Sequence, residues 1–258
     1  MTPPPSVLRA FGAPGRPQVL AGGKNGTWRC GDVVLKPAEG EADTIWRCGV
    51  LDTLPESADF RIARPLRAAG GGWLAEGWEA ARFVPGLADP RRVDDVIVAG
   101  AGFHRAVAGL PRPSFLDTTA DPWAYGDRLA WELPGTGPGR RSELLATLLT
   151  ARRPVDLPAQ LVHGDLLGNV LFADGLPPAV IDWSAYWRPP GWAVAVVDAL
   201  CWHGAGPGVV DRWAHLSDWR QLLIRALIYR IATTEATGRP VEREVYRPVV
   251  RLVVTCAE

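Results

Sequence analysis

Short apolar runs separated by glycine-rich turns dominate the first third of the chain, and longer amphipathic stretches dominate the rest. The short runs predict β-strands joined by tight turns, as in antiparallel hairpins, at residues 18–21, 27–30, 33–36, 60–66, 73–75 and 78–84. Residues 1–17 are rich in Pro and Gly and predict an irregular lead-in. The first third is therefore expected to form a small antiparallel sheet.

Helical periodicity appears once within this region and then throughout the remainder. Residues 41–54 are expected to form a helix because they place Ala42, Ile45, Trp46, Gly49 and Val50 on one face. Beyond Pro85-Gly86, the same periodicity predicts helices at 93–110, 141–152, 193–202, 211–236 and 241–256. Residues 111–139 carry many Pro and Gly and are expected to wrap the large lobe.

These patterns predict an α+β fold with two lobes. The small antiparallel β-sheet lobe takes residues 1–84 and the mostly helical large lobe residues 85–258, with a hinge near 82–88. At 258 residues, the chain is long enough to bury a sizeable core.

Residues 161–183 carry the strongest chemical signal. They are interpreted as a strand, a polar loop, a second strand, a turn at Asp174-Gly175 and a third strand that ends at Asp182. This layout predicts that Asp165, Asn169 and Asp182 meet at one end of a small sheet. Carboxylate and amide oxygens suit Mg²⁺, and a carboxylate that accepts a proton from an attacking hydroxyl completes a phosphoryl-transfer site.

A β-hairpin whose Asp and Asn residues only form turns is the alternative interpretation of this segment. It explains Asp174 well. It explains Asp182 poorly, because Asp182 ends an apolar run and is followed by Trp183.

His163-Gly164-Asp165, followed by Asn169 and Ile181-Asp182, resembles the aminoglycoside phosphotransferase and choline kinase-like family of the protein-kinase-like fold. The resemblance implies ATP and Mg²⁺ as cofactors and the phosphorylation of a hydroxyl or amine on a small-molecule acceptor. It implies that Asp165 is the catalytic base and that Asn169 and Asp182 bind the metal. Asp198 resembles an aspartate that begins a helix in the same family.

A nucleotide site is expected in the small lobe, where two strands flank a glycine cluster and a third ends in lysine. Backbone N–H groups of such loops approach phosphates closely, and the strand lysine pairs with the α- and β-phosphates. The candidates are Gly22, Gly23, Lys24 and Gly26 in the loop and Lys36 on the strand. The glycine spacing matches neither a Walker A loop nor a dinucleotide fingerprint, and ordinary hairpin turns use the same residues.

An acid on the helix that follows is expected to hold Lys36. Glu41 is the first choice and Glu39 and Asp43 are its rivals, although Glu41 also suits an ordinary first-turn acid favoured by the helix dipole. Lys24 and Lys36 are the only lysines in the chain, which otherwise uses arginine for its basic residues.

Composition excludes several other classes. A net charge of zero gives no basic surplus for nucleic acid, and no apolar run is long enough to span a membrane. The N-terminus lacks the layout of a signal peptide, and four scattered cysteines indicate reduced thiols in a cytoplasmic protein. The sequence does not indicate an oligomeric state.

Two questions stay open at this level. The aromatic residues that follow Asp182 suit either core packing or a wall of the acceptor site. One residue fewer separates Asp165 from Asn169 than is usual in the family. That spacing keeps open an alternative function, namely a nucleotide-binding, pseudokinase-like sensor or interaction module without transfer activity.

Overall fold

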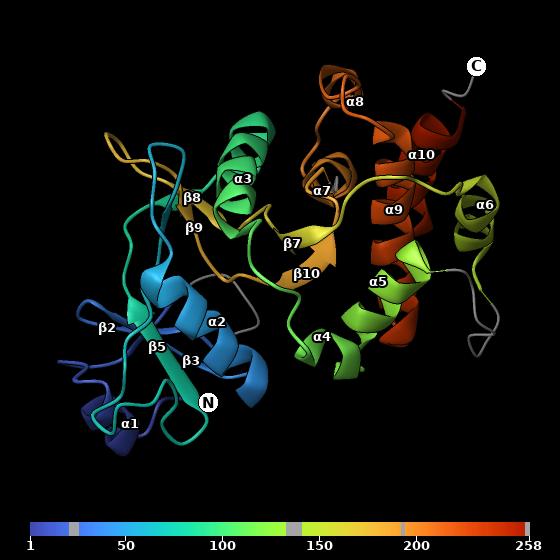
Figure 1. Ribbon diagram of the computed structural model, residues 1–258. Helices are drawn as coiled ribbons and strands as arrows, with labels where there is room; N and C mark the ends of the chain where they lie inside the picture. The colour runs from blue at the N-terminus through green and yellow to red at the C-terminus, as the bar shows by residue number, and fades with distance from the viewer. Residues whose placement is uncertain (21–25, 133–140, 192–193, 256–258) are drawn as a thin grey trace. The chain divides into compact units, whose positions relative to one another are not determined.

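The computed structural model describes residues 1–20, 26–132, 141–191 and 194–255 (Figure 1). It divides into two compact units. The first contains residues 1–87 and 169–183, and the second contains residues 88–168 and 184–258. The sequence-based division at 84/85 assigned residues 169–183 to the large lobe, whereas in the structure their strands pair with a strand of the first unit.

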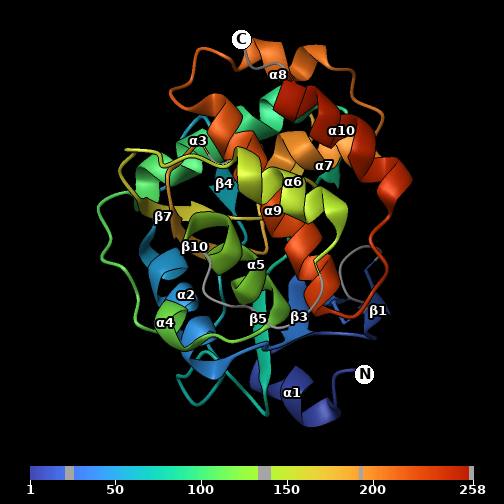
Figure 2. The same ribbon diagram turned by 90° about the vertical axis from the view of Figure 1, so that its right-hand side faces the viewer.

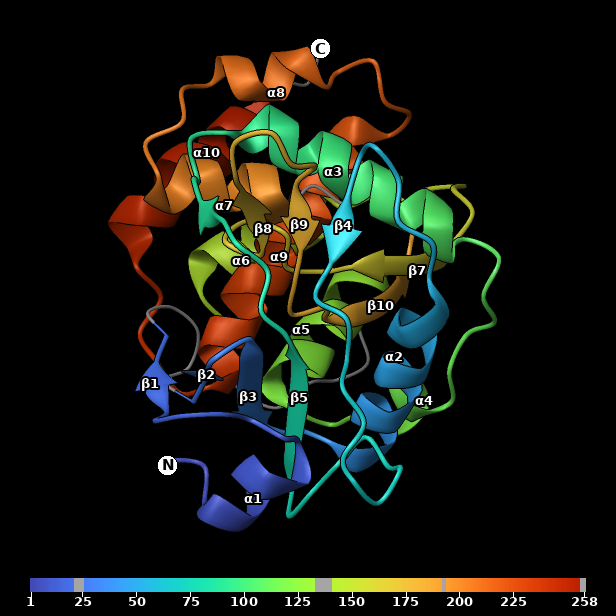
Figure 3. The same cartoon turned by 90° about the vertical axis from the view of Figure 1, so that its left-hand side faces the viewer.

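The main sheet of the first unit has four antiparallel strands in the order β1-β2-β3-β5 (Figure 3). The strands are β1 (Gln18–Val19), β2 (Trp28–Cys30), β3 (Val33–Pro37) and β5 (Trp78–Arg82). Gly31, with φ of +60°, makes the tight turn between β2 and β3.

The pairing register of β3 and β5 sorts their side chains between the two faces of this sheet. Leu35 pairs with Ala80, and both are buried in the apolar core that the sheet shares with Val7 and Phe11. Lys36 pairs with Glu79. Because successive side chains of a strand alternate between faces, this second pair lies on the opposite face from the apolar core.

Two helices flank this sheet, α1 (Pro5–Ala10) and α2 (Glu41–Thr53). The expectation of an irregular lead-in was wrong for α1, which has Pro5 at its first position, where the fixed φ of proline favours a helix start. Figure 1 shows α2 beside β3 and β5, and Arg47 of α2 contacts Glu79 of β5.

A second sheet has the order β4-β9-β8-β6. Its strands are β4 (Arg61–Ile62), β6 (Leu87–Ala88), β8 (Val170–Phe172) and β9 (Ala179–Val180). Residues 60–66 were expected in the main sheet, but β4 runs parallel to β9, and only Pro65 bridges to Ala81. Proline has no N–H to extend that ladder. Residues 73–75 form no strand, and Ala75 makes a single bridge to Trp78.

The second unit is mainly helical, with α9 packed against its neighbours α5, α6, α7 and α10 (Figure 2). Its helices are α3 (Val93–Val107), α4 (Phe115–Thr118), α5 (Pro122–Trp131), α6 (Glu143–Ala151), α7 (Val194–Trp202), α8 (Gly208–Arg212), α9 (Trp219–Ala236) and α10 (Arg243–Thr255). Apolar residues of α9 such as Ile224, Leu227 and Ile228 are fully buried, so α9 is the centre of this core.

Two departures from the expected helices have local causes. Residues 111–139 contain α4 and α5. Asp121 caps the start of α5, where its carboxylate accepts a hydrogen bond from the Ala124 N–H, and Pro122 is the first residue of the helix. The single helix expected at 211–236 is split into α8 and α9, and Asp218, with φ of +54°, lies at the break.

Strands β7 (Gln160–His163) and β10 (Ala185–Arg188) form an antiparallel pair in the second unit, with His163 opposite Ala185. Strand β10 lies in the aromatic segment after Asp182. Among the described residues, every helix is too short or too polar to cross a lipid bilayer.

Candidate functional site

Lys36 lies at the centre of a charged cluster in the first unit. Its Nζ donates a hydrogen bond to Oδ1 of Asp182 and lies 3.6 Å from Oε1 of Glu79. The register of β3 and β5 places Glu79 directly opposite Lys36. The structure therefore brings together Lys36 and Asp182, two residues that lie 146 positions apart in the sequence.

The acid beside Lys36 comes from a strand and not from the helix. Arg47 of α2 donates through Nη2 to both carboxylate oxygens of Glu79, at 2.8 and 3.1 Å, and its Nε lies 3.7 Å from Asp43. Burial opposes the charge of Arg47, yet the attraction of Glu79 and Asp43 outweighs it and raises the pKa of Arg47. Burial raises the pKa of Asp43.

Glu41, the first choice for this role, does not contact Lys36 through an ion pair in the structure. It is exposed in the first turn of α2 and forms no ion pair within the part of the chain that the structure describes. An exposed first-turn acid interacts favourably with the helix dipole, which was the alternative explanation of Glu41.

Asn169 precedes β8 and Asp182 follows β9, at the open end of the β8–β9 hairpin. The Ile181 N–H donates to the Asn169 carbonyl at 2.9 Å, so Asn169 lies opposite the residue that precedes Asp182. Asp182 has φ of +51°, a strained conformation for a residue other than glycine, and such strain is concentrated at functional sites.

The donor set of this hairpin fits Mg²⁺. One amide and one carboxylate supply hard oxygen ligands, and Mg²⁺ in phosphate-transferring sites takes one or two protein carboxylates and completes its shell with phosphate and water. Within the described ranges, no group of three or more His, Cys, Asp and Glu side chains is arranged to hold a metal. An amide and a carboxylate suit a metal whose remaining ligands are phosphate and water oxygens.

The expected glycine loop is only partly visible. Gly22, Gly23 and Lys24 lie outside the described residues. Gly26 is described, and a Cβ at this position would lie 3.3 Å from Cδ of Pro37, the residue after Lys36. The backbone at Gly26 therefore passes close to the end of the lysine strand, where a side chain would crowd it.

Asp165 lies in a second charged cluster, within the second unit. Nη2 of Arg230, on α9, donates to Oδ1 of Asp165 at 2.6 Å, and Nε donates to Oδ1 of Asp198 on α7 at 2.8 Å. Nη2 also donates to Oδ2 of Asp198. Burial opposes the charge of Arg230, but the two carboxylates raise its pKa well above the usual value, so the guanidinium is cationic.

Two histidines fix the backbone that leads into Asp165. His104 of α3 accepts, through Nε2, a hydrogen bond of 2.9 Å from the backbone N–H of His163. Nδ1 of His163 in turn accepts from the Asp165 N–H at 3.2 Å. Burial lowers the pKa of His104 to about 3, assisted by His163 and opposed by the Pro190 backbone, so His104 is a neutral acceptor at physiological pH.

The aromatic segment after Asp182 is mostly packed. Trp183 is buried and its ring lies 5.3 Å from that of Trp46, centroid to centroid, within the first unit. In the second unit the hydroxyl of Tyr186 lies 3.0 Å from that of Tyr229. Core packing therefore accounts for Trp183, while Trp192 lies outside the described residues.

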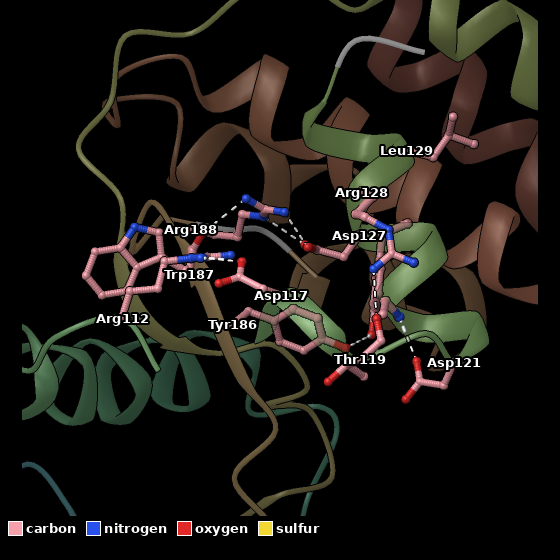
Figure 4. A network of polar contacts seen from close by, with 12 residues as sticks. Arg112, Asp117, Thr119, Asp121, Asp127, Arg128, Leu129, Tyr186, Trp187 and Arg188 are labelled. Carbon is pink, nitrogen blue, oxygen red and sulfur yellow. Dashed lines mark hydrogen bonds and ion pairs between the residues drawn. The ribbon is translucent and has the colours of Figure 1, made fainter. Parts of the chain in front are cut away.

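Figure 4 shows the polar network that surrounds β10 in the second unit. Nε of Arg188 donates to Oδ1 of Asp127 at 2.9 Å, and Nη1 of Arg112 donates to Oδ1 of Asp117 at 2.6 Å. Burial raises the pKa of Asp127 against the opposing effect of Arg188. The arginine of β10 is thus already matched by a carboxylate of α5.

Sequence reasoning missed four residues of these clusters: Arg47, Glu79, His104 and Arg230. Glu79 and Arg230 each interrupt an apolar run, in β5 and in α9 respectively. A charged residue inside an apolar element is almost never fully buried unless it is paired, which is the signal that could have identified them.

A sequence model described as the phosphotransferase enzyme family matches residues 39–219, well over half of the chain. The chain belongs to this family. No protein of curated function matches this phosphotransferase in sequence.

Solved structures of aminoglycoside phosphotransferases are similar to this phosphotransferase over almost its whole length. One from Alicyclobacillus acidocaldarius is 14% identical, with a TM-score of 0.60 over 99% of this chain and 92% of its own. A thermostable mutant of APH(4)-Ia in its apo form is 19% identical, with a TM-score of 0.61 over 97% and 98% of the two chains. The expected α+β, protein-kinase-like fold is confirmed by these likenesses.

Related structures have been solved with ligands. The thermostable mutant of APH(4)-Ia is described in a ternary complex with ADP and hygromycin B, at 18% identity and a TM-score of 0.61 over 97% of each chain. Aminoglycoside 2'-phosphotransferase-IIIa is described as a GDP complex, at 14% identity and a TM-score of 0.55 over 96% and 95% of the two chains.

Proposed function

We propose that this protein moves the γ-phosphoryl group of ATP, with Mg²⁺, to a hydroxyl or amine of a small-molecule acceptor. The observation that carries the proposal is the contact of Lys36 with Asp182, beside Asn169 on the same hairpin. A lysine, a carboxylate and an amide are the groups that bind the phosphates and the metal of a nucleotide in kinase-like sites. The ADP and the GDP named in two related structures support a nucleotide at this site.

Each residue has a chemical role in this proposal. Lys36 donates to the α- and β-phosphates, and the loop that contains Gly22, Gly23, Lys24 and Gly26 offers backbone N–H groups to them. Asn169 and Asp182 would hold Mg²⁺, which when bound neutralises phosphate charge.

Asp165 acts on the acceptor. Its carboxylate orients the hydroxyl or amine and accepts the proton that is lost as the new bond to phosphorus forms and the bond from phosphorus to the ADP oxygen breaks. Arg230, which binds the Asp165 carboxylate, and the His163 ring, which accepts from the Asp165 N–H, hold Asp165 in place for this step.

A second candidate function is a nucleotide-binding sensor or interaction module without transfer activity. It is favoured by the ion pair between Arg230 and Asp165, which occupies a carboxylate oxygen of the proposed base, and by the short spacing from Asp165 to Asn169. Release of ADP in the presence of an acceptor panel separates the two candidates, because the sensor binds ATP without acceptor-dependent turnover.

Thermal unfolding in ATP, with and without Mg²⁺, tests the nucleotide site. A ligand at 100 times its Kd adds about 2.7 kcal/mol to the folded state, which raises Tm by roughly 5–10 °C in a chain of this size. We expect this Mg²⁺-dependent shift in the wild type and its loss in Asp182→Asn, because asparagine tolerates the left-handed backbone of position 182 but lacks the charge.

Asp174→Ala is the matched control for that experiment. Asp174 lies exposed in the turn of the same hairpin, so its variant should keep the full shift. The absence of any nucleotide-dependent shift in the wild type would sink the ATP-site proposal.

A further inference from the structure

The acid that positions Lys36 can be identified from the geometry of the first unit. We propose that Glu79 is the positioning residue of Lys36 and that Arg47 fixes Glu79 in turn, so that the acid is supplied by β5 and the helix α2 supplies a cation. This inference rests on the proposed function, in which Lys36 binds the nucleotide phosphates.

The strand register provides the first argument. Lys36 and Glu79 are direct cross-strand partners in β3 and β5, and their charged atoms lie 3.6 Å apart. Directly opposed residues of an antiparallel pair have close Cβ atoms, and an opposite-charge pair there is favourable. The placement of Glu79 beside Lys36 is therefore fixed by the hydrogen bonding of the sheet itself.

Burial provides the second argument, because it distinguishes the two acids beside Lys36. The side chain of Glu79 is 7% exposed, whereas that of Asp182 is 53% exposed. Asp182 is accessible to other ligands, including the metal that the proposed function assigns to it. Glu79 remains the constant partner of Lys36 when Asp182 is engaged elsewhere.

The contacts of Arg47 provide the third argument. Its Nη2 donates to both oxygens of Glu79, and its side chain is as buried as that of Glu79. A planar guanidinium that binds both oxygens restricts the rotation of the carboxylate. The same oxygen of Glu79, Oε1, lies 2.8 Å from Nη2 of Arg47 and 3.6 Å from Nζ of Lys36, so the orientation that Arg47 sets also sets the carboxylate oxygen that faces the lysine.

The helix itself offers no better acid. Glu41 is exposed, and Asp43 lies within ion-pair distance of Arg47. Helix α2 therefore positions Lys36 indirectly: Arg47 of α2 binds Glu79, and Glu79 faces Lys36.

Glu79→Gln tests the proposal in the full chain. We measure its Kd for MgATP and for adenosine by isothermal titration calorimetry. Loss of a charge-assisted contact that holds Lys36 should weaken MgATP binding about tenfold or more, because such contacts are worth at least one decade in affinity. Affinity for adenosine, which has no phosphates, should stay within about twofold of the wild type. A general structural defect would weaken both ligands.

Two further variants make the result specific. Lys36→Met should lose MgATP affinity, and adding Glu79→Gln to it should cause no further loss, because Glu79 acts only through Lys36. Additive losses would overturn the proposal. Glu56→Gln is the matched control, since Glu56 lies in the same unit and its carboxylate is 3.7 Å from an arginine, Arg64, away from Lys36. It should bind both ligands as the wild type does.

A remaining possibility is that Glu79→Gln fails to fold, since it leaves the charge of Arg47 buried. The double variant Arg47→Gln with Glu79→Gln removes both charges and keeps hydrogen-bonding groups at both positions, and it provides the same measurement. Wild-type affinity for MgATP in a folded Glu79 variant would overturn the inference and leave the proposed function intact. No MgATP binding by the wild type would instead remove the proposed function, and the inference with it.

Discussion

Arg230 allows the sharpest prediction about the second unit. Its guanidinium bridges Asp165 and Asp198, and the side chains of Arg230 and Asp198 are only 15% and 9% exposed. Replacement of Arg230 by methionine keeps much of the volume but leaves the Asp198 carboxylate buried without its cation. Removal of one partner of a buried ion pair costs about 3–5 kcal/mol, and we expect a loss of unfolding free energy in that range.

Urea unfolding followed by tryptophan fluorescence measures this loss. The double variant Arg230→Met with Asp198→Asn removes the second charge as well, so it should be more stable than Arg230→Met alone, because replacement of a whole buried pair is often nearly neutral. The difference between the two variants isolates the cost of the unpaired carboxylate from the loss of arginine packing.

Arg112→Met is the matched control. Arg112 and Asp117 form an ion pair of the same 2.6 Å length that joins Arg230 to Asp165, but their side chains are 42% and 60% exposed (Figure 4). Exposed pairs contribute about 0–1 kcal/mol, so this variant should lose no more than that. Equal losses in Arg230→Met and Arg112→Met would refute the reasoning, since burial would then not matter.

Two further predictions concern the packing of the second unit, at His104 and at Gly126. The pKa of His104 is about 3 in the folded state and about 6.5 in the unfolded state. Acid therefore protonates the unfolded state first and favours it. The stability that His104 contributes is lost as the pH falls from about 6.5 towards 3, by up to about 1.4 kcal/mol per pH unit. His104→Gln keeps an acceptor without a titrating group, and urea unfolding at pH 7 and pH 5 should show a smaller loss in this variant; parallel losses would contradict the assignment. Gly126→Ala should destabilise the fold by about 1–3 kcal/mol, because the new Cβ would lie 2.7 Å from the Tyr229 carbonyl oxygen. Gly49→Ala, in an open helical position of α2, should instead raise the free energy of unfolding by up to about 1 kcal/mol in the same assay. A rise in both variants would contradict the tight packing of α5 on α9.

Local sequence patterns predicted most of the helices and strands, because each pattern depends only on the residues of its own segment. The hairpin signals at Gly31-Asp32 and Asp174-Gly175 coincide with turns in the structure, and the helix expected at 41–54 corresponds to α2. The face that was expected to be shared was wrong, because Ile45 is exposed and the buried face of α2 carries Cys48 and Leu51. The motif from His163 to Asp182 likewise requires only a short stretch of chain. Its resemblance to a known family was confirmed by the match over residues 39–219.

The errors arose where an element depends on a distant partner. Strand β4 was assigned to the main sheet, but it pairs with β9, which lies more than 100 residues further along the chain. The helix break at Asp218 has no glycine or proline to mark it. Helix α5 begins at Pro122, within a segment whose Pro and Gly content hid the helix start. Propensity does not encode these choices, because they are made by tertiary packing.

The acid of the lysine site was missed for the same physical reason. Helical spacing made Glu41 a reasonable choice, since it needs only the next element along the chain. Glu79 can be identified as the partner of Lys36 only when the pairing register of β3 and β5 is known, because this register places the two residues opposite each other. A one-residue shift of that register would turn Glu79 to the apolar core, so the position of this acid is a property of the sheet.

A common arrangement underlies both clusters: a buried arginine binds the carboxylate to which the proposals assign a role. Arg47 binds Glu79 in the first unit, and Arg230 binds Asp165 in the second. Burial of such pairs gives little net stability, because desolvation offsets most of the attraction. The planar guanidinium gives orientation instead, since it donates along fixed directions to a carboxylate, which a flexible ammonium does not do. In a chain whose only lysines are Lys24 and Lys36, arginine thus fixes the framework, and Lys36 is left as the compact charge that a phosphate can approach.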